Sequence, residues 1–265
     1  MITSNNNAKI KELTAWQKKA KLRNEDGIYI VEGIRMYREA PENEVRMVYV
    51  SESFYKENRE KLNLDGWKNR MEILSDSVFK HVSDTMTPQG VLLVMNQKKY
   101  SLEEVKKDRE KRKPLLMVLD NLQDPGNLGT ILRAGEAAGV TGVILSRDCV
   151  DIYNPKVIRS TMGSIYRMPF VYVEDLPLVV KELNKDGIHT YAAHLKGKGD
   201  FDEENFVEGT AFLIGNEGNG LRDETAEAAE IYVKIPMCGE VESLNAAIAA
   251  SVLMFEAARQ RRGSR

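Results

Sequence analysis

The sequence predicts an α/β protein in which a small mixed domain precedes a larger domain built on an open parallel sheet. Two observations lead to this fold class. Short apolar runs bounded by turn residues alternate with helical patterns throughout the chain. In the second half those runs are apolar almost without interruption, which is typical of parallel strands buried on both faces. A chain of 265 residues is long enough for two domains, each with its own core.

Residues 1–96 are expected to form the smaller domain. Ile10, Leu13 and Trp16 recur at the spacing of one helix face, so a helix is predicted over residues 5–23. Strands are predicted at 27–33, 45–51, 71–74 and 90–95, with helices at 34–40 and 76–84. This mixture of short strands and short helices indicates a compact α/β domain.

A segment rich in both kinds of charge, residues 97–113, separates the two domains. Its sequence, QKKYSLEEVKKDREKRK, offers few apolar side chains to bury. It is therefore interpreted as a charged linker or a short exposed helix.

Residues 114–265 are expected to form the larger domain. The apolar runs 115–120 and 140–146 flank a helical segment that begins near Asn127, and this order predicts a βαβ unit with parallel strands. Further strands are predicted at 168–173, 189–194, 210–216 and 231–237. A helix over 243–260 closes the domain, and Ser243 is its candidate N-cap. The small residues of this helix would let another helix or backbone approach closely; they are Ala246, Ala249 and Ala250.

The composition is that of an ordinary soluble globular protein, with 42% hydrophobic residues, 29% charged residues and a formal net charge of −2. The two cysteines and three histidines show neither a disulfide framework nor metal-ligand spacing, so no metal site is expected. A cytoplasmic protein without membrane contact is predicted, because no apolar run approaches a membrane span and the first residues lack a signal-peptide core. Basic clusters at 18–23, 106–113 and 259–265 are compatible with nucleic-acid binding, although a solvated helix face is the simpler interpretation of each one alone.

Three glycine-containing stretches follow apolar strands, at 121–127, 215–221 and 235–245. Ligands of open parallel sheets bind at the carboxyl ends of the strands, so these stretches are the candidate site. Each is accompanied by polar residues with no packing role, namely Asn127 and Arg133, Asn216 and Glu217, and Ser243 and Asn245. None of the stretches ends in Gly-Lys-Ser/Thr, and the spacing of GNEGNG is not that of a dinucleotide-binding fingerprint. A nucleotide- or NAD-binding oxidoreductase is therefore the disfavoured alternative.

Three motifs in this order resemble the SpoU (TrmH-type) branch of the SPOUT class of RNA methyltransferases. They read DNLQDPGNLGTILRAGEAAGV, LIGNEGNGL and IPMCGEVESLNAAIAASV, and the resemblance covers residues 115–260. In the first motif, Ala134 and Gly135 stand where relatives often carry a hydroxyl residue followed by alanine. The stretches ITSNNNAKIKEL, IYIVEG and TPQGVLLV resemble, more weakly, the substrate-binding domain of L30-like fold that precedes the catalytic domain in many members.

The resemblance implies an enzyme that transfers a methyl group from S-adenosylmethionine to a ribose 2′-hydroxyl of RNA. Relatives with such an N-terminal domain act on ribosomal RNA more often than on transfer RNA. The expected substrate is therefore ribosomal RNA, and the RNA of the large subunit is favoured. A tRNA ribose methyltransferase and an inactive RNA-binding member of the same fold are the alternatives. The family also implies a trefoil knot in the catalytic domain and a homodimer whose active site borrows residues from the partner.

On this resemblance the cofactor lies against the backbone of the last two motifs, and its expected contacts are Gly215, Asn216, Gly220, Ile235 and Leu244. The expected catalytic residues are Asn127, Arg133, Glu217, Ser243 and Asn245. Because a guanidinium keeps its proton, Arg133 is expected to grip an RNA phosphate and orient the hydroxyl. Glu217 would orient either Arg133 or the substrate, and Ser243 would either contact a ligand or only cap the last helix.

Overall fold

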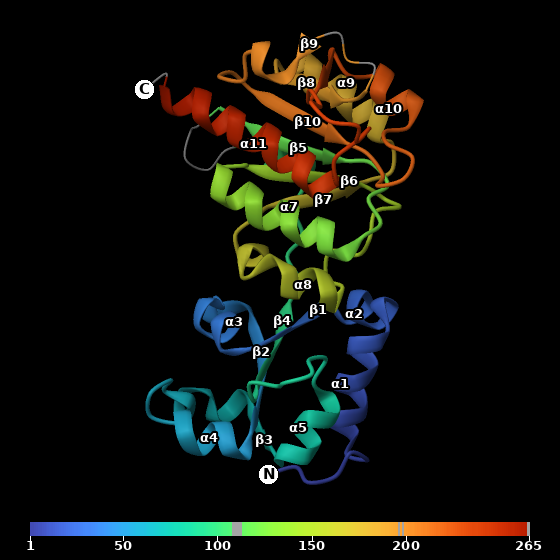
Figure 1. Cartoon of the computed structure of the whole chain (residues 1–265). Coiled ribbons are helices and arrows are strands. Elements are labelled where there is room, and N and C mark those ends of the chain that lie inside the picture. The colour runs from blue at the N-terminus through green and yellow to red at the C-terminus, as the bar shows by residue number, and fades with distance from the viewer. Residues whose placement is uncertain (108–112, 196, 198, 264–265) are drawn as a thin grey trace. The chain divides into compact units, whose positions relative to one another are not determined.

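The computed structural model describes residues 1–107, 113–195, 197 and 199–263, and the chain divides into two compact units. The first unit comprises residues 1–98 and 153–166; the second comprises residues 99–152 and the chain from Arg167 onward. Figure 1 shows the helices and strands in chain order. Within the described residues, no helix is both long enough and apolar enough to cross a membrane.

The first unit is built on a four-stranded sheet in the order β1-β4-β2-β3. Its strands are β1 (Ile28–Glu32), β2 (Val45–Ser51), β3 (Met71–Leu74) and β4 (Val91–Asn96). β4 is antiparallel to both β1 and β2, whereas β2 and β3 are parallel. The strands predicted for this part of the chain are confirmed.

Short helices cover this sheet: α1 (Ala8–Lys18), α2 (Ala20–Asp26), α3 (Ile34–Glu39), α4 (Glu52–Asn58), α5 (Asp76–Val82) and α8 (Pro155–Thr161). The single helix predicted over 5–23 is interrupted, because Lys19 has an extended backbone between α1 and α2. The buried Arg23 accounts for the break. Its guanidinium donates to the carbonyl oxygens of Trp16 (2.7 Å) and Gln17 (3.2 Å) and so replaces their helical partners.

The core of the first unit contains the helix face read from the sequence. Ile10, Leu13 and Trp16 are buried against α5 and the sheet. Residues 153–166 also belong to this unit: the ring of Tyr153 stacks on Tyr29 with centroids 4.6 Å apart. The sequence analysis placed residues 153–166 in the larger domain. It did not predict that they pack in the first unit, because the segment packs with strands more than a hundred residues away in sequence.

Within the described residues, the second unit contains a seven-stranded sheet in the order β7-β6-β5-β10-β8-β11-β9, and every pairing in it is parallel. The strands are β5 (Leu115–Leu119), β6 (Gly142–Ser146), β7 (Phe170–Val173), β8 (His189–Ala193), β9 (Gly199–Asp200), β10 (Thr210–Ile214) and β11 (Ile231–Lys234). The six strands predicted here are confirmed. The sequence missed β9, because a Gly-Asp pair carries no strand pattern.

Helices cover both faces of this sheet. α6 (Leu102–Lys106), α9 (Leu176–Lys185) and α10 (Asp223–Glu227) share one core with the side chains of Leu116, Val118 and Leu213. Side chains alternate along a strand, so the intervening residues point to the opposite face. There α7 (Pro125–Ala138) and α11 (Ala246–Gly263) lie side by side (Figure 1). A Cβ atom on Gly135 would lie 3.5 Å from the sulfur of Met254, an ordinary van der Waals distance, so the two helices pack directly against each other here.

Part of the charged segment 97–113 packs into the second unit. Residues 102–106 form α6, which Ser101 and Glu104 start with a reciprocal capping box. Val105 is fully buried, and a Cβ atom on Gly142 would come within 2.6 Å of it. The short helix that the sequence offered as an alternative to a linker is therefore present, but it is docked on the second unit through Val105, with Tyr100 and Leu102 packed against the same core. Residues 108–112 lie outside the described residues.

The predicted fold class, a parallel-sheet α/β domain preceded by a small α/β domain, is confirmed. The trefoil knot implied by the resemblance stays a prediction.

Candidate active site

Three loops leave the carboxyl edge of the parallel sheet. The first turn (residues 120–127) follows β5, the glycine loop (215–221) follows β10, and the third loop (235–245) follows β11. β5 and β10 are neighbouring parallel strands whose last paired residues are Leu119 and Ile214. Directly after this pair, the amide of Asp120 donates to the carbonyl oxygen of Ile214 (2.9 Å). The first turn and the glycine loop therefore start side by side.

A cavity of about 380 Å³ lies between the glycine loop, the third loop and the end of β8. This volume is in the range of cavities that hold small organic ligands. Every residue expected to contact the cofactor lines it, namely Gly215, Asn216, Gly220, Ile235 and Leu244. Of the expected catalytic residues, Glu217 and Ser243 also line it.

The glycine loop closes on itself through its backbone. The amide of Asn216 donates to the carbonyl oxygen of Gly220 (2.8 Å), and the amide of Gly220 donates back to that of Asn216 (2.9 Å). A Cβ atom on Gly215 would overlap the backbone of Gly220 and Leu221, so only glycine fits there. Gly220 has a φ of +72°, a conformation that also favours glycine. The glycines thus let the loop form a compact turn at the edge of the cavity.

Glu217 ties the glycine loop to the first turn. One carboxylate oxygen accepts hydrogen bonds from the amide of Asp124 (2.9 Å) and the side-chain amide of Asn127 (3.0 Å), and the other accepts from the amide of Gln123 (3.2 Å). Burial by itself would raise the pKa of Glu217. The hydrogen bonds from Asn127 and from backbone amides outweigh burial and lower that pKa, because they stabilise the charged form.

Asn245 extends this chain of hydrogen bonds to α11. Its side-chain amide donates to the Oδ1 atom of Asn127 (2.9 Å). Its own Oδ1 atom accepts from the backbone amides of Ala247 (2.9 Å) and Ile248 (3.3 Å). Asn127, Glu217 and Asn245, three of the five expected catalytic residues, are therefore joined in one network.

The N-cap predicted at Ser243 is wrong. α11 begins at Ala246, so the residue before it, Asn245, occupies the cap position and bonds the second and third amides of the helix. Ser243 lies two residues upstream, beyond reach of those amides, and its side chain is exposed at the cavity. Contact of Ser243 with a ligand stays a prediction.

Arg133 stands apart from this network. It lies on α7, about 9 Å further along the helix axis than Asn127. Its side chain is exposed, does not line the cavity, and makes no hydrogen bond or ion pair with any residue that the structure describes. Within one chain, Glu217 therefore contacts the first turn and makes no contact with Arg133.

The sequence analysis missed four polar residues that line the cavity, His194, Asn219, Lys234 and Glu242. His194 directly follows β8, so the rule that ligands bind at the carboxyl ends of strands would have found it. Glu242 carried no distinguishing signal, since Glu240 stands beside it in the same loop. Among the described residues, no cluster of three His, Cys, Asp or Glu side chains is arranged to hold a metal ion.

The chain matches two family models and is similar in sequence to known methyltransferases. A model described as the SpoU rRNA Methylase family matches residues 114–255, and a model described as an MRM3-like substrate binding domain matches residues 7–93. The chain is 34% identical over 183 residues to the 23S rRNA (guanosine(2553)-2′-O)-methyltransferase RlmP of Bacillus subtilis, covering 69% of this chain and 70% of that protein. It is 38% identical over 150 residues to the 23S rRNA (guanosine-2′-O-)-methyltransferase RlmB of Xanthomonas campestris, covering 57% and 60% of the two chains.

Solved structures resemble the chain over almost its full length. The SpoU methyltransferase AviRb of Streptomyces viridochromogenes, in complex with the cofactor AdoMet, superposes with a TM-score of 0.85 at 28% identity, covering 97% of this chain and 100% of that one. An AdoMet-bound rRNA methyltransferase of Sinorhizobium meliloti gives a TM-score of 0.84 at 27% identity, covering 97% of both chains.

The assignment of the helix cap predicts different outcomes for two neighbouring substitutions. Asn245→Ala should lower the free energy of unfolding by about 0.5–2 kcal/mol, the usual range for a lost N-cap. Ser243→Ala, the matched control, should change it by less than about 0.5 kcal/mol. Urea denaturation of the three proteins measures both values, and a larger loss in Ser243→Ala would contradict the assignment.

The lowered pKa of Glu217 predicts how the variant Glu217→Gln depends on pH. The carboxylate contributes stability above its unfolded pKa of about 4.3, and that contribution is lost as pH falls through the lower folded pKa. The difference in unfolding free energy between wild type and Glu217→Gln should be full from about pH 5 upward and shrink only below about pH 4. Denaturation curves across this range test it. A difference that already disappears near pH 6 would show that the hydrogen bonds do not stabilise the charged form.

Proposed function

Because the chain belongs to the SpoU rRNA methylase family, we propose that it transfers a methyl group from S-adenosylmethionine to a ribose 2′-hydroxyl of ribosomal RNA. The observation that carries the proposal is the cavity formed by the glycine loop and the third loop. Relatives named as 23S rRNA 2′-O-methyltransferases favour RNA of the large ribosomal subunit. The match of residues 7–93 to a substrate-binding domain favours recruitment of the RNA by the first unit. Ribosomal RNA as the substrate favours a cytoplasmic location.

The residues of the cavity fit the proposed cofactor. The absence of a side chain at Gly215 lets the glycine loop fold back against the backbone of Gly220 and Leu221, and the side chains of Ile235 and Leu244 supply apolar contact for a base. Backbone amide and carbonyl groups of the same loops can recognise the polar edge of that base. S-adenosylmethionine supplies an electrophilic methyl group on a sulfonium sulfur.

The network around Glu217 orients the site and does not remove the proton of the ribose hydroxyl. Its carboxylate oxygens already accept hydrogen bonds from the first turn, and a lowered pKa makes the carboxylate a weak base. The ribose oxygen forms a bond to the methyl carbon as the bond from that carbon to sulfur breaks. We propose that the proton leaves to water or to an RNA phosphate, and that Ser243, exposed at the cavity, contacts the ligand.

Arg133 is proposed to grip a phosphate of the RNA. Its guanidinium is exposed and makes no ion pair with a described residue, so its donors are available to a ligand. A planar fork of N–H donors matches phosphate oxygens and would orient the neighbouring ribose.

A homodimer would bring Arg133 to a cavity from which it is distant in its own chain. Two large apolar residues on α11, Ile248 (50% exposed) and Phe255 (45% exposed), are seven residues apart and so share one face of the helix. α11 lies beside α7, which carries Arg133. We propose that two copies pack through this face and that each Arg133 serves the cavity of the partner.

The function is tested with unmodified transcripts of large-subunit rRNA, small-subunit rRNA and tRNA incubated with labelled S-adenosylmethionine. We expect label in large-subunit rRNA, at one ribose that becomes resistant to alkaline hydrolysis. Label in tRNA instead would favour a tRNA ribose methyltransferase. Binding of RNA and cofactor without any label would favour an inactive RNA-binding member.

Arg133→Ala should lower the rate of methyl transfer on the order of 10²–10³-fold while S-adenosylmethionine binding stays close to normal. Arg133→Lys should also be badly impaired, since an ammonium lacks the planar fork. Single-turnover rates and a cofactor titration measure both effects, with the exposed Arg147→Ala as control. A Lys variant that keeps most of the wild-type rate would show that only positive charge is needed.

Mixing two inactive variants tests the shared site. Gly215→Val destroys the cavity by distorting the glycine loop, because a Cβ atom at this position would overlap the backbone of Gly220 and Leu221. Arg133→Ala removes the clamp, so only a mixed dimer has one intact cavity facing one intact arginine. After subunit exchange, activity should recover to about a quarter of the wild-type value, because random pairing leaves one working site in half of the dimers. No recovery, with dimers confirmed by sedimentation, would place Arg133 in the site of its own chain. A monomer in sedimentation would overturn the dimer itself.

A further inference from the structure

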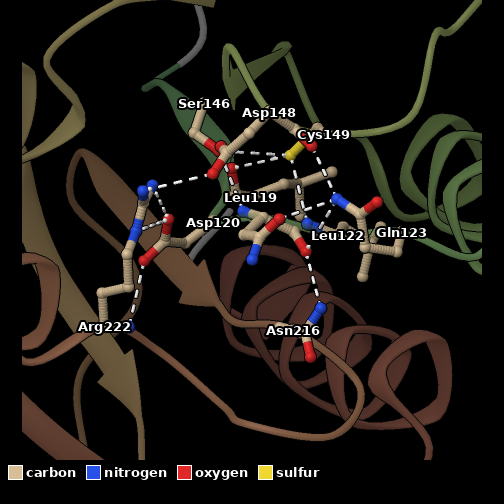
Figure 2. A network of polar contacts seen from close by, with 10 residues as sticks. Leu119, Asp120, Leu122, Gln123, Ser146, Asp148, Cys149, Asn216 and Arg222 are labelled. Atoms are coloured by element: carbon tan, nitrogen blue, oxygen red, sulfur yellow. Dashed lines mark hydrogen bonds and ion pairs between the residues drawn. The ribbon is translucent and has the colours of Figure 1, made fainter.

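An ion pair that the sequence analysis did not single out joins the glycine loop to β5. Asp120 follows the last residue of β5 and is fully buried, and Arg222 follows the last residue of the glycine loop. The backbone amide of Arg222 donates to Oδ2 of Asp120 (3.1 Å), its Nε donates to Oδ1 (2.8 Å), and its Nη2 donates to the same Oδ1 (Figure 2). The carboxylate thus receives three hydrogen bonds from one residue.

The same guanidinium also reaches β6. Its Nη1 atom is 3.2 Å from Oδ2 of Asp148, whose Oδ1 accepts from the hydroxyl of Ser146 (2.5 Å). That hydroxyl in turn accepts from the backbone amide of Asn121 (2.8 Å). Figure 2 shows Arg222 placed between Asp120 and Asp148. Arg222 therefore fastens the end of the glycine loop to the ends of two neighbouring strands.

The other end of the glycine loop is fastened to the same place. The side-chain amide of Asn216 donates to the carbonyl oxygen of Asn121 (2.8 Å), the residue next to Asp120. Glu217, between these two ends, is held by the first turn. The loop that lines the cavity is thus held at its start, its middle and its end by the segment that follows β5.

We propose that Arg222 and Asp120 are positioning residues for the cofactor: their ion pair sets the closing end of the glycine loop and thereby the shape of the cavity. This inference rests on the proposed function. A fully buried carboxylate is costly unless it is paired and hydrogen-bonded, so a pair serving stability alone has no advantage over apolar residues. Hydrogen bonds are directional and apolar contacts are not. The bonds between Arg222 and Asp120 therefore fix the orientation of the backbone at the end of the glycine loop, which lines the cavity.

The test compares Arg222→Lys with Arg147→Lys. Arg147 also forms an ion pair at this end of β6, with Glu174, but both side chains are 72% exposed. Arg222→Lys keeps the charge beside Asp120 and loses the fork. We expect about a tenfold rise in the Kd for S-adenosylhomocysteine and in the KM for S-adenosylmethionine, with kcat and the KM for RNA within about twofold of wild type. Arg147→Lys should leave all four values unchanged.

Binding is measured by calorimetry below the melting temperature of each protein, so that loss of stability alone does not alter the Kd. Asp120→Asn should likewise weaken cofactor binding while kcat stays close to that of the wild type. If Asp120→Asn does not fold, Arg222→Lys alone provides the test. An unchanged Kd in Arg222→Lys with a lowered melting temperature would overturn the inference and leave the proposed function standing. A wild-type protein that binds no S-adenosylhomocysteine would overturn both. Cofactor binding by the wild type without methylation of any RNA would overturn only the function.

Discussion

The parallel pairing of β5 with β10 is the constraint on which the rest of the site depends. The two strands stay in register to Leu119 and Ile214, and the hydrogen bond from the Asp120 amide to Ile214 extends the pairing into the loops. Both loops therefore leave the sheet at one place. Only with this common origin can residues that are some ninety positions apart in the chain, such as Asp124 and Glu217, form hydrogen bonds with each other.

A division of labour between backbone and side chains follows from this geometry. Backbone hydrogen bonds, made possible by Gly215 and Gly220, shape the glycine loop at the cavity, whereas polar side chains fasten the loops to each other. Glu217, an acidic residue that lines the cavity, serves in that second group: its oxygens are engaged by amides and its pKa is lowered. A carboxylate bound in this way contributes order to an active site more than it contributes basicity.

Where the structure departs from the sequence analysis, a single contact decided the outcome. Arg23 bonds two carbonyl groups and divides one expected helix in two. Val105 docks a short helix in a segment that was expected to be a charged linker or an exposed helix. Asn245 takes the cap position expected of Ser243, because the helix starts later than its apolar pattern. In each case the pattern identified the right kind of element, and a side chain outside the pattern set its limits.

Apolar runs and glycine turns are local features, so the amino-acid sequence was enough to locate nearly all the strands, the parallel fold class and the three stretches that surround the site. The resemblance of three ordered motifs to one family added the expected cofactor contacts, all of which line the cavity. Which polar residues meet became known from the folded chain alone. The hydrogen bond between Asn127 and Asn245 joins residues 118 positions apart, and that between Asp120 and Arg222 joins residues 102 positions apart. The spacing of apolar residues along the sequence does not predict contacts at such separations. Partners at that separation are chosen by strand order and register, which exist only once the sheet has formed.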